Sequence, residues 1–539
     1  MALLAGSLDG LPAPTPPAPM PGELSTLTRK GRGPLALLAG SLDGLPGPHP
    51  SSADACSVGM MANLDPVTTA MRPDQRRERP QGPMGRAYRL LTVALLALVT
   101  IIAFEAMAIS TAMPRVAADL DAVRSYGLAF SVMLTAEMLG IVLAGVWSDR
   151  HGPLPSLFAG QILMAAGSAL AGLAPTFTIL LTGRLIAGLG AGLIVVALYV
   201  VIGRAYPDML RPKVFSWVSA AWVLPSLIGP PIAGWLASTW SWRWVFLIVL
   251  APIVVTFAVV MTQRERINQD GAADHATRSE HSMGSGRSGH LRLSLLGLGV
   301  ALSAGAVQWG SDQLVPAHAL PVSLAVLGLV GVALTAPRLV PAGTLRMSRG
   351  LPAVMMSRFL LTAAFNGALT FIPLMLVNER HLSLTTAGIT LTVGALGWSF
   401  GSFVQGHHAM LNRRSELVVA GGASLTVGIL LLAAIVGFGW HYYLVGLATA
   451  VSGLGMGLAM SSTSVLALAL SPVSGHGSAS SSLQLSDVLG SVMGISAAGA
   501  VFAGLHNPNG SDNGVFELIW VSLAAVAALV MLGGQQTRT

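Results

Sequence analysis

The sequence predicts an all-α protein that crosses a membrane many times, and three observations carry this prediction. Only 10% of the 539 residues are charged, whereas an ordinary soluble domain has about 25%. Hydrophobic residues make up 53%, and the mean hydropathy is +0.68. From residue 89 onward, apolar runs alternate with short polar breaks, and each run is close to the ~20 residues that cross a bilayer as a helix. This composition excludes a water-soluble globular enzyme.

Fourteen membrane spans are predicted from these apolar runs. Their ends are placed to within about 2–4 residues. The runs cover residues 90–112, 126–148, 154–174, 176–201, 214–237, 244–262, 293–311, 317–336, 351–376, 385–405, 417–437, 441–469, 478–505 and 516–534.

The segment before the first span has a different composition. Residues 1–87 are rich in Pro, Gly, Ser and Arg, and the sequence ALLAGSLDGLP at 2–12 returns at 36–46. No apolar stretch here is long enough for a signal-peptide core or a span. We expect a disordered cytoplasmic tail. The alternative is that translation starts later, at Met60, Met61 or Met84.

Basic residues gather on one side of the predicted membrane. With the N-terminus inside, and counting from Arg72 onward, twenty-one Lys and Arg lie on the inner side, against four in the outer loops: Arg115, Arg124, Arg243 and Arg380. This positive-inside bias predicts that both termini are cytoplasmic, in a plasma (inner) membrane protein. It also accounts for the net charge of +7 without a nucleic-acid partner.

An internal repeat predicts two related helical bundles. The pattern Gly-Leu-Gly-x-Gly at 188–192 recurs at 453–457, which is 265 residues later. At the same offset, two glycines of the fifth span match two of the thirteenth: Gly229 with Gly494, and Gly234 with Gly499. Such register indicates duplication. The predicted organisation is a six-helix bundle at 88–262, a cytoplasmic loop at 263–292, two inserted helices at 293–349 and a second six-helix bundle at 350–539.

No cofactor or metal is expected. The one cysteine, Cys56, excludes an intramolecular disulfide and a Cys-based metal site. Neither lysine, Lys30 nor Lys213, follows a glycine-rich loop, so the chain has no Walker A motif and ATP is not expected to drive it.

Few formal charges lie well inside the spans. Insertion of a charged residue into the membrane costs about 2.5–3.5 kcal/mol, so we expect each of these residues to have a function or a partner. The acids are Glu105, Glu137 and Asp487, and the base is Arg184. Arg358 lies one to two turns from a span end, from which its side chain can snorkel. At about 1.5 Å per residue, Glu105 lies roughly 10 Å and Arg184 roughly 12 Å from the outer ends of their spans, so they can share a level.

Four segments carry a family resemblance. Residues 145–152 read Gly-Val-Trp-Ser-Asp-Arg-His-Gly, and residues 181–190 read Leu-Thr-Gly-Arg-Leu-Ile-Ala-Gly-Leu-Gly. Residues 225–234 read Pro-Ser-Leu-Ile-Gly-Pro-Pro-Ile-Ala-Gly, and residues 104–114 read Phe-Glu-Ala-Met-Ala-Ile-Ser-Thr-Ala-Met-Pro. With fourteen spans, these resemble the motifs of the major facilitator superfamily, in particular its fourteen-helix drug:proton antiporters. The first segment departs from the family, because Pro and Leu follow it in place of basic residues.

The resemblance implies a major-facilitator fold and assigns roles to residues. Helices one and four are neighbours in that fold, so Arg184 is expected to pair with Glu105 and tune it for proton coupling. A static buried ion pair is the alternative. Glu137 and Asp487 are expected to line the substrate path, and a hydrogen bond to a neighbouring helix is their alternative. The residues expected to serve the conformational cycle are Gly145, Asp149, Arg150, Gly152, Gly188, Gly229, Pro230 and Gly234.

These features predict a transporter rather than an enzyme. We expect a monomeric proton-coupled antiporter that exports lipophilic or cationic compounds by alternating access, since three acids face one Arg. One alternative is an exporter of an endogenous lipid or metabolite, and another is a sensor that uses the tail to bind a partner. A membrane-embedded enzyme is a further alternative, but the acids near outer span ends, Asp119, Asp121 and Asp312, are scattered.

Overall fold

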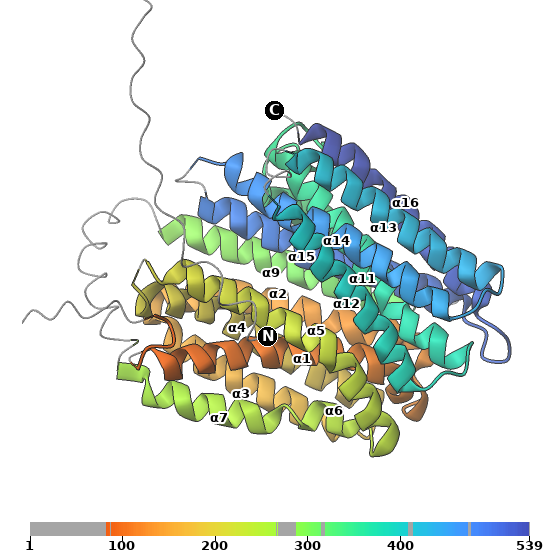
Figure 1. Cartoon of the computed structure of the whole chain (residues 1–539), viewed down its shortest axis with the longest axis horizontal. Coiled ribbons are helices and arrows are strands. Elements are labelled where there is room, and N and C mark those ends of the chain that lie inside the picture. The colour runs from red at the N-terminus through yellow and green to blue at the C-terminus, as the bar shows by residue number, and fades with distance from the viewer. Residues whose placement is uncertain are drawn as a thin grey trace, which may run out of the picture. The chain divides into compact units, whose positions relative to one another are not determined.

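The computed structural model describes residues 82–86, 88–207, 209–265, 267, 287–313, 319–407, 413–472 and 476–537. Nearly all of the predicted tail lies outside these ranges. Within them the chain is helical, with no β-strand, as predicted. Figure 1 shows the helices lying roughly along one direction as a bundle.

The helices follow the predicted spans in order. The first half contains α1 (Arg89–Asp119), η1 (Val123–Ser125), α2 (Tyr126–His151), α3 (Pro153–Gly172), α4 (Phe177–Ala205), α5 (Arg211–Thr239), α6 (Arg243–Leu247) and α7 (Leu250–Thr262). The middle contains α9 (Arg287–Asp312), α10 (Ala319–Thr335), η2 (Ala336–Arg338) and η3 (Thr344–Arg346). The second half contains α11 (Leu351–Asn378), α12 (Leu384–Gln405), α13 (Arg414–Gly437), α14 (Tyr443–Ala469), α15 (His476–Leu505) and α16 (Asn513–Gln536).

Thirteen helical segments in the described part of the chain are long and apolar enough to cross a membrane, with α6 and α7 forming one of them. The predicted seventh span is the helix α9, which is not among the thirteen. Most helix ends agree with the predictions, but α1 continues through Pro114 to Asp119. Val116 and Ala117 are fully buried, so tertiary packing extends this helix past Pro114 and beyond the predicted span end at residue 112.

The Arg89 end of the bundle is the end at which α1 begins, and the Asp119 end is the end at which α1 finishes. Short connections make consecutive helices antiparallel, so α2 begins at the Asp119 end and returns. A hydrogen bond of 3.0 Å from Trp242 Nε1 to Asp119 Oδ2 joins the connection before α6 to the same end.

Glycines bring α4 into backbone contact with two neighbours. A Cβ added at Gly188 would lie 2.3 Å from the carbonyl oxygen of Met133 on α2. A Cβ added at Gly190, on another face of α4, would lie 2.5 Å from the amide nitrogen of Met164 on α3. Such close approach is how small residues drive helix association in lipid, where burial of apolar side chains gives little advantage.

The repeated glycines make equivalent contacts in the second half. A Cβ at Gly453 would lie 2.1 Å from the carbonyl oxygen of Gly394 on α12. A Cβ at Gly455 would lie 2.5 Å from that of Gly421 on α13. Thus α14 packs between α12 and α13 as α4 packs between α2 and α3. The internal repeat read from the sequence is therefore present in the packing, whereas the exact division into domains stays a prediction.

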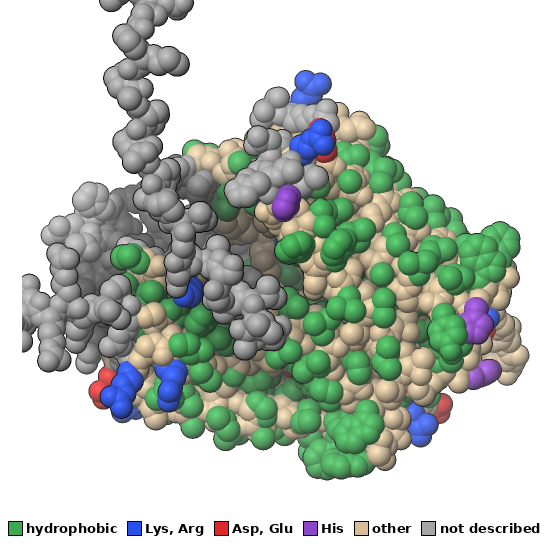
Figure 2. Space-filling model, viewed as in Figure 1, with side chains coloured by type: hydrophobic (Ala, Val, Ile, Leu, Met, Phe, Trp, Pro, Cys, Tyr) green, Lys and Arg blue, Asp and Glu red, His purple; other side chains and the backbone are tan. Residues whose placement is uncertain are grey.

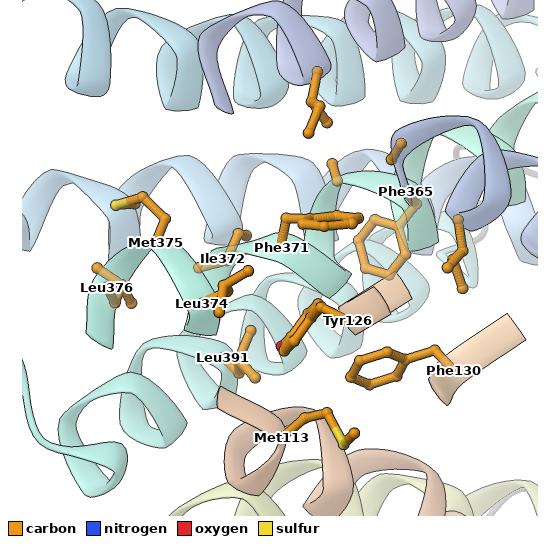
Figure 3. Packing of buried hydrophobic residues seen from close by; sticks show 14 of the residues in the cluster. Met113, Tyr126, Phe130, Phe365, Phe371, Ile372, Leu374, Met375, Leu376 and Leu391 are labelled. Atoms are coloured by element: carbon orange, nitrogen blue, oxygen red, sulfur yellow. The ribbon is translucent and has the colours of Figure 1, made fainter. Parts of the chain in front are cut away.

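Contacts between the two halves lie toward the Asp119 end. Between α5 and α12, a Cβ at Gly234 would lie 2.6 Å from the carbonyl oxygen of Leu384. Between α2 and α15, a Cβ at Gly127 would lie 3.0 Å from the Cα of Gly499. Figure 3 shows Tyr126 of α2 beside Phe371 of α11, with ring centroids 5.5 Å apart. The buried hydrophobic cluster at this end includes residues of both halves.

We predict that Gly190→Ala destabilises the protein by about 1–3 kcal/mol, because the added methyl group meets the backbone of α3. Gly203→Ala is the matched control on the same helix, since a Cβ there meets nothing within 4 Å. Unfolding of the purified variants in detergent gives both values. Equal stability of the two variants would contradict the packing argument.

Candidate functional site

The predicted partners Glu105 and Arg184 are neighbours in the structure. Arg184 Nη1 of α4 lies 3.6 Å from Glu105 Oε1 of α1, and both side chains are almost fully buried. Ser168 of α3 donates a hydrogen bond of 3.4 Å to the same carboxylate oxygen. Arg184 Nε donates one of 3.2 Å to the carbonyl oxygen of Ala129 on α2. One ionic group therefore connects the first four helices.

This ionic group is incompletely hydrogen-bonded. Glu105 Oε2 and Arg184 Nη1 are buried and have no hydrogen-bond partner. A buried polar atom without a partner costs about 1–3 kcal/mol, more when charged, and is rare in native structures. The pair is close enough for Coulomb attraction but lacks the geometry of a tight, static ion pair.

Glu137 of α2 is near the same group and has no partner of its own. The residue is half-buried, and its side chain has no hydrogen bond or ion pair with the described residues. The charged groups that act on it electrostatically are Glu105 and Arg184. A Cβ at Gly192 would lie 2.2 Å from the Glu137 carbonyl oxygen, so α4 holds this turn of α2 firmly.

Asp487 of α15 makes a tight ion pair that the sequence analysis missed. Arg358 Nη2 of α11 lies 2.7 Å from Asp487 Oδ2, and Arg358 Nε donates to Oδ1. Arg358 Nη1 also donates to the carbonyl oxygen of Met460 and, over 3.1 Å, to Thr463 Oγ1 on α14. The prediction that Arg358 snorkels to a span end is wrong, because its side chain is 7% exposed and pairs with Asp487 inside the bundle.

A sequence signal for this pair exists in the glycine pattern. A Cβ at Gly490 would lie 2.3 Å from the carbonyl oxygen of Phe359 on α11. Asp487 is three residues before Gly490, and therefore on the same face of α15, while Arg358 directly precedes Phe359. The small residue Gly490 thus marks the face of α15 on which Asp487 meets another helix, and the packing shows that this helix is α11.

The residues predicted to serve the conformational cycle lie at helix ends and contacts. Gly152 ends α2 with φ +79°, a conformation that favours glycine. Asp149 and Arg150 are helical at this end of α2, but their side chains lie outside the described residues. Gly145 has open space around its Cβ position.

The predicted motif in α5 lies where the two halves touch. A Cβ at Gly388 of α12 would lie 2.5 Å from the carbonyl oxygen of Pro230. Gly229 faces Phe104 of α1 at 3.5 Å, which is ordinary contact. The helix runs from Arg211 to Thr239 without a break at its three interior prolines, Pro225, Pro230 and Pro231.

Comparisons with known proteins agree with this architecture. The sequence model described as Major Facilitator Superfamily matches residues 95–495. The multidrug transporter protein MdtP of Bacillus subtilis (strain 168) is 25% identical over 64% of this chain and 62% of its own length. The multidrug efflux pump SdrM of Staphylococcus aureus (strain N315) is 28% identical over 32% of this chain and 38% of its own. The chain spans less than two thirds of the length of these two relatives.

Solved structures give the same fold at low identity. The POT family transporter PepTSo superposes with a TM-score of 0.59 at 13% identity, covering 82% of this chain and 96% of that one. A peptide transporter POT in complex with sulfate gives 0.57 at 13%, covering 84% and 96%. These likenesses concern the fold alone. With the family match over most of its length and thirteen candidate spans in its described part, the chain is a multi-pass membrane protein that belongs to the Major Facilitator Superfamily.

Proposed function

We propose that this transporter is a proton-coupled antiporter that exports lipophilic or cationic compounds by alternating access. The observation that carries the proposal is the buried, incompletely hydrogen-bonded pair of Glu105 and Arg184 beside the unpaired carboxylate of Glu137. The multidrug names of two relatives support the same substrate class. The driving force is a proton gradient, with no cofactor, and the working unit is a monomer.

The Arg89 end faces the cytoplasm in this proposal, because the basic residues of the sequence gather at the loops of that end. The membrane is the plasma (inner) membrane. The contacts between the two halves lie toward the opposite end, at Gly234, Gly388 and Gly127. The described arrangement therefore corresponds to a state that is closed outside and open toward the cytoplasm.

Proton coupling follows from the charge of one carboxylate. When Glu105 is ionised, it attracts Arg184. When it binds a proton, that attraction is lost, and Arg184 keeps its hydrogen bond to Ala129 on α2. Because the group touches α1 to α4, the change of charge alters the balance among four helices and can bias two conformations of this half.

Glu137 is the acid that selects substrates by their charge in this proposal. Asp487 is neutralised by Arg358 within the second half, and Glu105 by Arg184 in the first. Glu137 is the remaining acid of the three, and it has no ion pair in the described part of the chain. A cationic substrate can supply the missing positive charge at this site.

The first prediction concerns coupling. In everted vesicles with a preformed pH gradient, several cationic dyes or drugs should collapse the gradient with the wild type, and the response should fall to background with Glu105→Gln. Glu265→Gln, an exposed carboxylate after α7, should behave as wild type. An undiminished response of Glu105→Gln would move coupling to Glu137 or Asp487. A wild type silent to the whole panel would favour an endogenous lipid or metabolite as cargo.

The second prediction concerns charge selection. Glu137→Gln should raise KM for a cationic substrate about tenfold, equivalent to ~1.4 kcal/mol, because the unpaired charge is lost. KM for a neutral lipophilic substrate should stay unchanged. Transport assays with one substrate of each charge measure both values, and equal loss for both would remove Glu137 from charge recognition.

The third prediction separates a structural pair from a coupling pair. Arg358→Leu should cost about 3–5 kcal/mol of unfolding free energy, because it leaves Asp487 buried and unpaired. The double variant Arg358→Leu, Asp487→Leu should recover most of this loss. Arg115→Leu, which breaks the exposed pair with Asp119, should cost less than about 1 kcal/mol. A double variant that is no more stable than Arg358→Leu alone would contradict this assignment.

A further inference from the structure

The connection between α1 and α2 carries a hydrogen bond that joins the two halves at the Asp119 end. Arg124 lies in η1, the short helix of this connection, and its Nε donates a bond of 2.8 Å to the carbonyl oxygen of Ala503 on α15. Because α15 belongs to the second half, this bond has to break if the halves separate here. In Figure 2 the charged and His side chains of the face shown lie toward the two ends of the bundle, where polar groups meet water.

The local structure of α15 explains why Ala503 accepts this bond. Ala503 lies in the last turn of α15, where carbonyl oxygens lack amide partners within the helix. The amide of Asn507 would be its partner in a longer helix, but Asn507 precedes Pro508 and donates instead to Asp512 Oδ1 over 3.0 Å. The guanidinium of Arg124 supplies the missing donor and places a positive charge at the negative end of the helix dipole.

This hydrogen bond lies just outside the closest contact between α2 and α15. A Cβ at Gly127 would lie 3.0 Å from the Cα of Gly499. Arg124 precedes Gly127 by three residues, and Ala503 follows Gly499 by four. Both partners are therefore about one helical turn nearer to the end of the bundle than the glycine contact.

Met113 of α1 lies behind the glycine contact. It is six residues from the end of α1 at Asp119, or about 9 Å inside, and it is fully buried. Figure 3 shows it in the buried cluster that also holds Tyr126 of α2 and Phe371 of α11. Separation of the halves at this end would bring Met113 into contact with water, so it is a suitable reporter position.

The inserted helix α9 holds η1 from another side. Ser125, which follows Arg124, donates a hydrogen bond of 2.8 Å to Asp312 Oδ2, and Gln313 Nε2 donates one of 3.1 Å to the same oxygen. Asp312 is 9% exposed, and Arg124 acts electrostatically on its carboxylate. A buried carboxylate of the insert therefore attracts the positive charge of Arg124 and bonds to the turn that carries it.

Further polar contacts attach this end of α9 to the first half. Gln308 Nε2 donates a hydrogen bond of 3.1 Å to the carbonyl oxygen of Ser131 on α2, and it also donates to Thr135 Oγ1. Gln308 and Asp312 are four residues apart, so they lie on one face of α9. The cluster that α9 forms with α15 consists of apolar side chains. The polar bonds of the insert thus hold η1 in the position from which Arg124 reaches α15.

We propose that the bond from Arg124 to Ala503 is an outer latch that holds the arrangement closed to the outside, and that Asp312 of the inserted helix is its positioning residue. This inference rests on the proposed alternating-access function, in which the Asp119 end faces outward. Asp312 acts through η1 and Arg124, because its carboxylate has no hydrogen bond or ion pair with the described residues of the second half. The inserted helices then stabilise one of the two states of the transport cycle.

Cysteine labelling from outside the cell tests the latch in the full-length protein. In a Cys56→Ser background, Met113→Cys reports opening, and Asn509→Cys, in the exposed connection after α15, reports constant access. Intact cells receive a membrane-impermeant sulfonated maleimide. Arg124→Gln should speed labelling of Met113→Cys about fivefold, equivalent to ~1 kcal/mol, and leave that of Asn509→Cys unchanged. Arg124→Lys keeps the charge and a donor, so labelling should return to within about twofold of the background.

Two further variants test the role of α9 and the need for a bond between halves. Asp312→Asn keeps the shape of the side chain and should speed labelling of Met113→Cys about threefold. Added to Arg124→Gln, it should give no further increase, because Asp312 acts through Arg124. The matched control is Arg115→Gln, which breaks the exposed pair with Asp119 within α1. It removes a charge at the same end without separating the halves, so labelling should stay unchanged.

The outcomes that overturn the latch are distinct. Labelling at the background rate in Arg124→Gln would show that the bond does not hold the halves together. An equal increase in Arg115→Gln would indicate a general loosening of this end. If the effects of Arg124→Gln and Asp312→Asn multiply in the double variant, Asp312 does not act through Arg124.

The same measurements keep the latch separate from the proposed function. If Asn509→Cys reacts only in everted vesicles, the proposed orientation is wrong, and the comparison of variants in those vesicles decides on the latch. If labelling changes as expected but the wild type moves no protons in response to dyes or drugs, the latch stands and proton-coupled export fails.

Discussion

Backbone contact at glycines is the constraint on which the rest of this structure depends. Helices in lipid gain little from burying leucine against leucine, because the lipid is equally apolar, so close approach of backbones must supply the packing. In each half one helix is placed between two others by glycines on different faces, as Gly188 and Gly190 show in α4. Gly234 and Gly127 use the same device between the halves. Contacts made of backbone tolerate no gradual deformation, so the halves are suited to move as bodies rather than to bend.

Charges are the second constraint, and the protein treats its two buried ion pairs differently. Arg358 satisfies Asp487 with two hydrogen bonds and uses its remaining donors on α14. Arg184 lies 3.6 Å from Glu105, and each retains a buried atom without a partner. An ion pair whose hydrogen bonds are all made resists a change of protonation. A pair with buried atoms that lack hydrogen-bond partners loses less free energy when its carboxylate is protonated. This contrast is why we assign coupling to the first half and a fixed role to the pair in the second.

The sequence predicted the order and ends of the helices well, because hydropathy and helix length are local properties. It also predicted that Glu105 and Arg184 lie together. Residue counting places them at a similar depth, and the family resemblance implies that their two helices are neighbours. It did not find the partner of Asp487, because which faces of two distant helices meet depends on tertiary packing. The signal was present in Gly490, but its meaning requires knowing that α15 packs on α11. Likewise, the end of α1 at Asp119 is fixed by burial rather than by Pro114.

The inserted helices break the symmetry that duplication creates. Two related bundles meet through two similar seams, one between α5 and α12 and one between α2 and α15. An insert that bonds to α2 at Ser131 and packs against Val488 and Val492 of α15 covers only one of them. Because α9 contacts both halves, it must also slide against at least one of them when they move. Its contacts with α15 are apolar, while its polar ones are with α2 and the adjoining η1. Apolar contacts lack fixed directions, so the α15 side is where such sliding costs least.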